Sequence, residues 1–401
     1  MRSVASELPA GAEGHGTRHA PPACCVTIVA HDIGSMRGME RQLSELVVGL
    51  GRLGHRITLI ARTCELPAGT DVAFHRVRGP SRPFLIAYPW FMVAGSLAVR
   101  RWRRGVVQAT GAIVLNRVDV IAVHYCHQVA TATPSRSTWL FRAHVKLAGM
   151  LKRIGERVCF RVNRAAALVC VSKGVAEEIR EHHPALAERI LTIHNGIDTA
   201  CFAPGVHHSE AQAMRAALGI SEERLVAAFV ASEWERKGLA VLIQALAHAP
   251  DWDLVVAGGG DEQHYRKLAH SLGVGEAVHW LGVTHEVQLV YELADAFVLP
   301  SSYETFSLVT FEAAANGLPI LVTPVNGVRE LINDGQNGFL ITAEPRVIAE
   351  RLSRLAADPA LRRRLGQAAR SSALQFGSEK MVAKHHELYT RLAGEHRGAE
   401  R

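Results

Sequence analysis

The sequence predicts an α/β fold built from two doubly wound, Rossmann-like domains that face each other across a cleft. Short apolar runs alternate with amphipathic stretches along the chain, and this alternation occurs in both halves. The chain has 401 residues, 48% of them hydrophobic, which is enough for two domains that each have a core. Because open parallel sheets bind ligands beyond the carboxyl ends of their strands, we expect the functional site between the two domains.

The first half of the chain opens with a β-loop-α-β unit. Its expected strands are short apolar runs, at residues 25–30, 56–61, 106–109, 120–123, 168–171 and 191–195. Its expected helices lie at residues 40–53, closed by Gly54, and from residue 172 onward. The irregular residues 196–205 follow, and we interpret them as a hinge between the domains. Closure about such a hinge would exclude water from the cleft.

The second half repeats this organisation. Its expected strands lie at residues 225–230, 254–257, 278–281, 296–299 and 320–322. Its expected helices lie at residues 238–247, 261–272, 287–293, 307–315 and 379–392. The chain is therefore expected to divide into a disordered tail at 1–22, a first domain at 23–195, a second domain at 206–376 and a C-terminal helix at 377–401.

Cysteine spacing and the first residues indicate an intracellular protein. The seven cysteines show no C-x-x-C spacing of the kind that holds zinc or forms a redox pair, so we expect reduced thiols. The tail is rich in Gly, Ala, Pro and Glu and lacks the apolar segment of a signal peptide. The expected location is the cytoplasm, either free or on the inner face of the membrane.

Residues 300–319 are the most informative segment, because they set two carboxylates around the start of an expected helix at 307–315. The first turn of a helix leaves backbone N–H groups unpaired and carries the positive end of the helix dipole. A phosphate is therefore expected at the amides that follow Phe306, those of Ser307, Leu308 and Val309.

The two carboxylates are Glu304, just before this helix, and Glu312, inside it. Carboxylates beside a phosphate repel it, so we expect both to accept hydrogen bonds from hydroxyl groups. A diphosphate with a sugar at each end fits this arrangement. A helical glutamate is usually solvated, but Phe311 and residues 313–315 are apolar or small, so Glu312 is expected to be buried with a partner.

Arg236 and Lys237 follow an expected strand and a short loop, directly before the helix expected from Gly238. Two cations there can neutralise the negative charge of a departing diphosphate. The alternative is a solvated basic turn. Their occurrence in the same chain as the carboxylate pair favours a binding role.

Glu304 and Glu312 have the spacing of an E-x7-E signature, and the chain resembles the large family of retaining glycosyltransferases called GT4, which has the GT-B fold. Further landmarks agree with the family: NGID at residues 195–198, RKG at 236–238, VVAGGG at 255–260, WLG at 280–282 and ADAFVLPS at 294–301. The resemblance is strong over the second half and weaker over the first. It implies a nucleotide-sugar donor, a hexosyltransferase-type reaction without an obligatory metal, and a last helix that returns to the first domain.

Two loops depart from the family pattern. Many members have Gly-Arg a few residues before the basic pair, where this chain has Ala231-Ser232. In the first domain the family favours Gly-Gly, and here the loop reads Arg37-Gly38. Gly38 still lets the backbone approach a phosphate at a helix start, and Arg37 offers a charge. A plain loop before a capped helix is the alternative interpretation of Gly38.

His124 and His127 follow the strand expected at residues 120–123. The resemblance implies a first-domain histidine beside the donor sugar, where it helps to stabilise a developing oxocarbenium ion, and we assign this role to His124. A packed histidine at a strand end is the alternative. A metal site is not expected, because no acidic or cysteine ligand accompanies the pair in the sequence.

The net charge of +7 is unevenly distributed. Residues 72–118 contain no carboxylate but have arginines at positions 76, 78, 82, 100, 101, 103, 104 and 117. Within them, residues 83–99 form an apolar run that is slightly short for a bilayer span. Two interpretations stay open: a core helix with a basic end, and an interfacial helix on anionic lipid. Nucleic acid is not an expected partner, since no recognised nucleic-acid module accompanies the charge.

We therefore expect a retaining glycosyltransferase that moves a sugar from a nucleotide sugar to a glycan or lipid-linked acceptor, in cell-envelope polysaccharide or glycolipid synthesis. Glu304 would hold the transferred sugar and Glu312 the ribose. A non-catalytic sugar-nucleotide-binding protein and a sugar-nucleotide epimerase of the same fold stay open as alternatives. A glycoside hydrolase also uses two carboxylates, but it needs neither the cations nor a phosphate-binding helix start.

Overall fold

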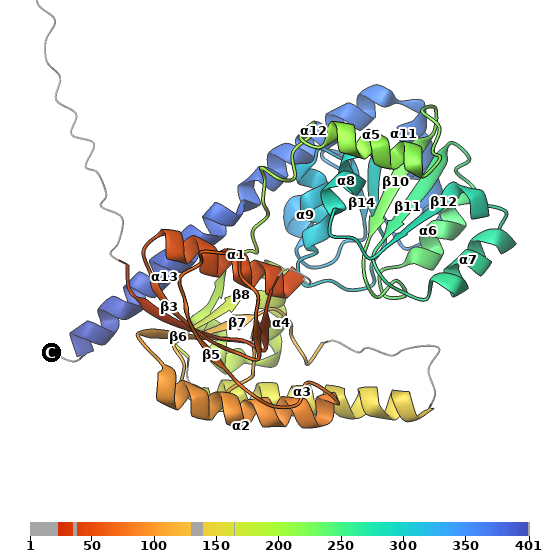
Figure 1. Cartoon of the computed structure of the whole chain (residues 1–401). Helices are drawn as coiled ribbons and strands as arrows, with labels where there is room; N and C mark the ends of the chain where they lie inside the picture. The colour runs from red at the N-terminus through yellow and green to blue at the C-terminus, as the bar shows by residue number, and fades with distance from the viewer. Residues whose placement is uncertain (1–22, 35–37, 130–138, 164, 400–401) are drawn as a thin grey trace, which may run out of the picture.

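The computed structural model of the chain describes residues 23–34, 38–129, 139–163 and 165–399; the tail predicted at 1–22 and the predicted charge of Arg37 lie outside these residues. Each half of the chain contains one parallel sheet with helices on both faces (Figure 1). The structure confirms the predicted α/β class and its two doubly wound sheets.

The first sheet has seven strands in the order β5-β3-β1-β6-β7-β8-β9, and all of its neighbours pair in parallel. Its strands are β1 (Cys25–Val29), β3 (Arg56–Ala61), β5 (Ala73–Arg76), β6 (Val106–Thr110), β7 (Val120–Val123), β8 (Ala167–Cys170) and β9 (Ile190–Thr192). A small extra pair consists of β2 (Asp32–Ile33) and β4 (Thr63–Cys64). The helices of this half are α1 (Gly38–Arg52), α2 (Phe84–Trp102), α3 (Trp139–Asn163), α4 (Lys173–His182) and the 3₁₀ turn η1 (Pro184–Arg189).

The second sheet has six strands in the order β12-β11-β10-β13-β14-β15, again all parallel. Its strands are β10 (Leu225–Val230), β11 (Trp252–Ala257), β12 (Val278–Gly282), β13 (Ala296–Leu299), β14 (Ile320–Val322) and β15 (Phe339–Leu340). The helices are α5 (His208–Ala217), α6 (Leu239–Leu246), α7 (Glu262–Ser271), α8 (Val287–Glu292), α9 (Leu308–Ala315), α10 (Val328–Leu331), α11 (Pro345–Ala357), α12 (Pro359–Ala373) and α13 (Ser378–Ala399), with 3₁₀ turns η2 (Gly275–Ala277) and η3 (Leu374–Phe376).

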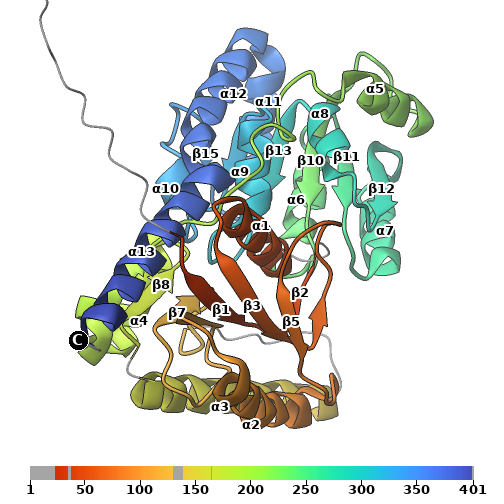
Figure 2. The ribbon, with the colours of Figure 1, turned by 60° about the vertical axis from the view of Figure 1, so that its left-hand side comes forward.

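The last helix, α13, crosses from the second sheet to the first and packs against α1 (Figures 1 and 2). Its apolar side chains join the cluster of buried residues that covers one face of the first sheet, namely Met381, Val382, Leu388, Tyr389 and Leu392. The approach is close, because a Cβ on Gly49 of α1 would lie 2.4 Å from Val382 Cγ2. The first core is therefore built from residues of both ends of the described chain.

Two segments cross between the sheets side by side. One is the predicted hinge at 196–205, and the other leads from η3 into α13. The amide of Ile197 donates to the carbonyl of Phe376 at 2.9 Å, and the amide of Ser378 donates to the carbonyl of Ile197 at 3.0 Å. Gln42 of α1 holds the neighbouring Gly196 through two hydrogen bonds of 2.7 Å each. The hinge role and the exact domain boundaries stay predictions.

Most predicted strands and helices coincide with observed ones, and the differences are mainly of one to three residues at their ends. Residues 84–99 of the predicted apolar run lie in α2, whose N-cap is Pro83, and the helix buries Tyr88, Phe91 and Val99 in the first core. The structure adds elements that we did not predict: β2, β4, β5, β15, α3, α5, α10, α11 and α12. Short edge strands depend on pairing partners that are distant in the sequence, so the local pattern is a weak signal for them.

Candidate active site

A cavity of about 660 Å³ lies between the two sheets. Its lining residues follow the carboxyl ends of strands: His31 after β1, Gly111 after β6, His124 after β7, Ala231 after β10 and Glu304 after β13. In the first sheet the chain adds strands on one side of β1 and then continues on its other side with β6. In the second sheet the same switch occurs between β10 and β13. Doubly wound sheets bind ligands at such points, so this cavity is the candidate site.

The starts of two helices contribute to the cavity wall. Ser307, Leu308 and Val309 at the start of α9 line the cavity, and so does Gly38 at the start of α1. The two starts are close together, because a Cβ on Gly38 would lie 3.2 Å from Leu308 Cδ1. Both helices therefore direct the positive ends of their dipoles and their first N–H groups toward the same space, which favours an anion.

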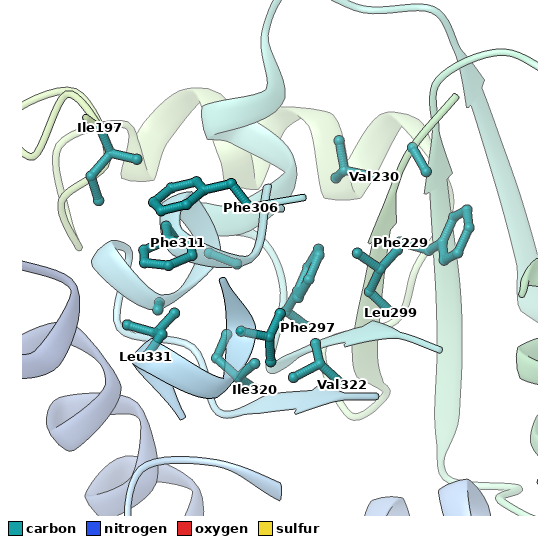
Figure 3. Close-up of a cluster of buried hydrophobic side chains, with 14 of the residues drawn as sticks. Ile197, Phe229, Val230, Phe297, Leu299, Phe306, Phe311, Ile320, Val322 and Leu331 are labelled. Carbon is teal, nitrogen blue, oxygen red and sulfur yellow. The ribbon is translucent and has the colours of Figure 1, made fainter. Parts of the chain in front are cut away.

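The segment before α9 is fixed from behind by its aromatic side chain. Phe306 is 1% exposed, and its ring stacks on Phe311 at 4.1 Å between ring centroids, next to Ile197 (Figure 3). Ser307 has a left-handed backbone conformation, with φ 71° and ψ 60°, and its hydroxyl lies 2.8 Å from that of Thr310. The ring of Phe306 thus packs in the core, and its backbone is the part that can face a ligand.

The basic pair lies directly before α6 and against the Glu304 loop, where the amide of Ser302 donates to the carbonyl of Arg236 at 3.0 Å. Lys237 Nζ forms a buried ion pair with Glu304. Arg236 binds Glu233 through Nε at 3.1 Å and through Nη2 at 2.6 Å. The predicted alternative of a fully solvated basic turn does not fit Lys237, whose side chain is 11% exposed.

Glu304 faces the cavity with 7% of its surface exposed. Besides Lys237, it accepts a hydrogen bond of 2.8 Å from Ser301 Oγ. Two donors therefore fix one carboxylate oxygen, Oε1, which leaves Oε2 available to accept from a ligand hydroxyl.

Glu312 lies deeper than Glu304. It is 1% exposed and ion-paired with Arg41 of α1, and it accepts a hydrogen bond of 3.2 Å from the hydroxyl of Tyr291. This confirms the expected burial and the expected partner. Glu312 is not among the residues that line the cavity, so the structure brings Glu304, Arg236, Lys237 and the α9 start together but sets Glu312 behind them.

His124 lies at the border of the main cavity and a small second cavity of about 30 Å³ that also reaches His385 of α13. Desolvation of its ring, with a smaller effect of His385, lowers the pKa of His124 to about 4. The ring is therefore neutral at pH 7. His127 also lines the cavity, and its amide donates to Glu156 Oε2 at 2.8 Å.

The start of α4 joins the loop that precedes α9. Ser172, which caps α4 by accepting from the amide of Val175, donates from its hydroxyl to the carbonyl of Thr305 at 2.7 Å. Tyr303 donates from its hydroxyl to Glu178 of α4 at 3.1 Å. These bonds hold the Glu304 loop against the first half of the chain.

Three residues of this region were not predicted from the sequence. Arg41 and Tyr291 bind Glu312, and Lys152 of α3 lines the first-half end of the cavity. Arg41 lies three residues after Gly38 in α1, and only the folded chain brings it to Glu312. In the part of the chain that the structure describes, no three His, Cys, Asp or Glu side chains are grouped as metal ligands would be.

Gly238, between Lys237 and α6, permits a close contact with the Glu304 loop. Its φ is +79°, and a Cβ there would lie 2.3 Å from the carbonyl oxygen of Pro300. Gly219 has a similar φ of +70° but open space around the corresponding position. We expect Gly238→Ala to lower the free energy of unfolding by about 1–3 kcal/mol more than Gly219→Ala, because only the first adds a clash to the backbone strain. Urea denaturation of both variants measures this difference, and equal losses would contradict the contact.

Comparisons with known families match both halves of the chain. Residues 36–200 match the model of Glycosyltransferase Family 4, and residues 210–372 match the model of Glycosyl transferases group 1. A D-inositol 3-phosphate glycosyltransferase of Salinispora arenicola is 32% identical over 307 residues, which are 72% of this chain and 66% of that protein. The corresponding enzyme of Streptomyces bingchenggensis is 31% identical over 57% of this chain and 53% of its own length. The chain thus spans about half to two thirds of these relatives.

Solved structures agree with these matches. WaaG, a glycosyltransferase involved in lipopolysaccharide biosynthesis, superposes with a TM-score of 0.75 at 20% identity over 90% of this chain and 99% of its own. Anabaena HepE in complex with UDP and glucose superposes with a TM-score of 0.69 at 19% identity, over 90% of this chain and 97% of its own. At these identities the likeness shows the fold. From the family models and the fold together, the chain belongs to the GT4 family of glycosyltransferases and has the GT-B fold.

Proposed function

We propose that the cavity binds a nucleotide-diphosphate sugar and transfers its sugar with retention of anomeric configuration, without an obligatory metal ion. The observation that carries this proposal is the convergence of two helix starts and the pair Arg236 and Lys237 on one cavity beside Glu304. Backbone amides and fixed cations are the groups that bind a diphosphate, and a carboxylate binds sugar hydroxyls.

The donor would extend from the main cavity toward Glu312, which lies behind the cavity wall. Its diphosphate would lie on the amides that follow Phe306, and the free oxygen of Glu304 would accept from hydroxyls of the transferred sugar. Glu312 lies behind the cavity wall and is paired with Arg41, so it would have to become accessible from the cavity to accept from the ribose, with the Arg41 guanidinium balancing its charge. Because Lys237 is paired with Glu304, the phosphate would share this cation with the carboxylate.

The transfer step would need no protein nucleophile. The bond between the anomeric carbon and the phosphate oxygen breaks while the acceptor oxygen attacks from the same face, and the departing diphosphate takes the acceptor's proton. Arg236 and Lys237 would stabilise the charge that grows on the diphosphate. The neutral ring or the backbone of His124 would lie beside the developing oxocarbenium ion.

We further propose a glycan or lipid-linked acceptor in cell-envelope synthesis. Support comes from the relatives named D-inositol 3-phosphate glycosyltransferases and from WaaG, which is involved in lipopolysaccharide biosynthesis. The first-half end of the cavity would receive the acceptor, where Lys152 and His127 offer donors and Tyr88 and Phe160 offer apolar surface.

A thermal-shift screen with UDP-, GDP-, ADP- and dTDP-sugars tests donor binding. We expect one nucleotide series to raise the melting temperature, because a ligand at about 100 times its Kd stabilises the folded state by ~2.7 kcal/mol. The shift should persist in EDTA. A shift that requires a divalent cation would contradict the metal-independent site, and the absence of any shift would contradict the donor site itself.

Product analysis then separates the proposal from its alternatives. Retention predicts that the new glycosidic bond has the anomeric configuration of the donor, which NMR spectroscopy of the product determines. A transferase is expected to release free nucleotide only when the sugar is transferred to an acceptor or hydrolysed. Binding without any turnover would identify a sensor, and a changed sugar still attached to its nucleotide would identify an epimerase.

A further inference from the structure

Two neighbouring helices of the first half expose rows of apolar side chains. The row on α2 is 52–60% exposed and consists of Ile86, Trp90, Val93 and Leu97. The row on α3 is 41–53% exposed and consists of Leu147, Met150, Ile154, Val158 and Val162. Each row repeats every three or four residues, so it occupies one face of its helix. Contiguous exposed apolar surface of this kind marks an interaction site.

The two rows belong to one surface of the molecule. Helices α2 and α3 contact each other and run along the side of the first sheet that is opposite α13 (Figures 1 and 2). The opposite faces of both helices are accounted for by the core, where Phe91 and Val99 of α2 and Cys159 and Phe160 of α3 are buried. The exposed rows are therefore not needed to hold the helices on the sheet.

Cations flank these rows, and exposed acidic side chains are absent from both helices. The exposed cations are Arg100 and Arg101 at the end of α2, and Arg142, Lys146, Arg157 and Arg161 along α3. Helix α2 has no acidic residue. Glu156, the single acidic residue of α3, is 1% exposed and lies 3.1 Å from His183 Nε2. The surface thus combines apolar rows with charge of one sign.

We propose that this α2–α3 face docks on the surface of an anionic lipid bilayer, with the apolar rows at the level of the headgroups and the cations at the lipid phosphates. Arginine and lysine place their aliphatic stems on apolar surface while their charged ends reach phosphate, so both features of the face are used at once. A second copy of this chain would set cation against cation. Nucleic acid would neutralise the cations but leave the apolar rows against a polar backbone.

This attachment is peripheral. Across the ranges that the structure describes, no helix combines the length and the apolar character needed to cross a bilayer. The inner faces of the same helices contribute Tyr88 and Lys152 to the wall of the cavity. Docking would therefore hold the acceptor end of the cavity near the lipid surface, a consequence that rests on the proposed function.

Co-sedimentation of the full chain with vesicles tests the docking surface. Vesicles of phosphatidylcholine alone are compared with vesicles that also contain phosphatidylglycerol, at low and high salt. We expect binding to the anionic vesicles only, with each Arg or Lys near the surface contributing about fivefold to the partition coefficient. The charge variant Arg100→Gln/Arg101→Gln/Lys146→Gln/Arg161→Gln should therefore lose several-hundredfold at low salt.

Apolar variants test the rows themselves. Val93→Ser/Leu97→Ser/Met150→Ser/Ile154→Ser should weaken binding by at least about tenfold, since interfacial binding scales with buried apolar area. The matched control Val206→Ser/Val283→Ser removes two exposed apolar side chains of the second half and should bind like the wild type. Thermal shifts with donor show that each variant is folded.

Three results would overturn the proposal: wild-type protein that stays in the supernatant at low salt, an apolar variant that binds like the control, or a wild-type oligomer that the apolar variant abolishes. Binding to duplex DNA with the same residue dependence but no vesicle binding would assign the face to nucleic acid instead. Failure of the donor screen with intact vesicle binding would refute the proposed function and leave this surface standing.

Discussion

Glu304→Ala is expected to reduce sugar transfer to background, a loss of at least about 10³-fold in kcat/KM, while the protein stays folded. The reason is geometric: the carboxylate is 7% exposed at the cavity wall, and Ser301 and Lys237 fix it through the same oxygen. Removing it takes away the acceptor for the sugar hydroxyls and leaves Lys237 without its partner. Radiolabelled or mass-spectrometric transfer assays measure the loss.

Two comparisons make this result specific. Glu304→Gln keeps the shape and removes the charge, so it should lose less than alanine but far more than Glu222→Ala, an exposed glutamate before β10. Urea denaturation should show that Glu304→Gln unfolds close to the wild type. Near-normal turnover by Glu304→Ala would refute the assignment of Glu304 to the donor sugar.

Lys237→Met should lower kcat by about 10²–10³-fold, because a cation fixed before the reaction stabilises charge that grows on the leaving diphosphate. Methionine keeps the length and flexibility of the side chain without its charge. The exposed Lys267→Met on α7 is the matched control and should keep full activity. Steady-state kinetics with saturating donor separates this loss in kcat from weaker donor binding.

The ion pair itself must be separated from a direct role of Lys237. If Lys237 served only to balance Glu304, then Lys237→Met would cause no further loss once Glu304→Gln has removed the charge. We expect a further loss in that background, since the diphosphate still needs the cation. Equal rates for Glu304→Gln and the double variant would show that Lys237 acts through Glu304 alone.

The half of the site that belongs to the second sheet was predictable from the sequence because it is local. A strand, a loop with Glu304 and the start of α9 follow one another within about twenty residues, and strand direction decides which end faces the cleft. Lys237 lies in a similar strand-to-helix connection. The roles assigned to these residues stay predictions that the experiments above test.

The Arg41–Glu312 pair could not be predicted in the same way. Its two residues are 271 positions apart, and only the assembly of both halves brings them together. The alanines and phenylalanine around Glu312 indicated burial, but a pattern on one helix does not identify the partner that the other half supplies. Tyr291 in α8 belongs to the same half as Glu312, but it lies in a separate helix, so the pattern of α9 does not identify it either.

Helices α2 and α3 show a different limit of sequence patterns. The apolar run at residues 83–99 is compatible with a core helix and with an interfacial helix on anionic lipid. The buried face of α2 supports the core helix, and its exposed apolar face motivates the interfacial one. Helix α3 was not predicted as a helix at all. Its apolar residues Leu147, Met150, Ile154, Val158 and Val162 recur at helical spacing, so the signal was present in the sequence and the helix was overlooked.

The crossing of α13 has a consequence for the order in which the chain folds during synthesis. Met381, Val382, Leu388, Tyr389 and Leu392 complete the apolar layer over β1 and α1, so this layer stays open to water until they leave the ribosome. The second sheet, by contrast, closes within a continuous stretch that ends before α13. The usual N-terminal-first order is therefore reversed at this point, because translation of α13 completes the core of the domain that was made first.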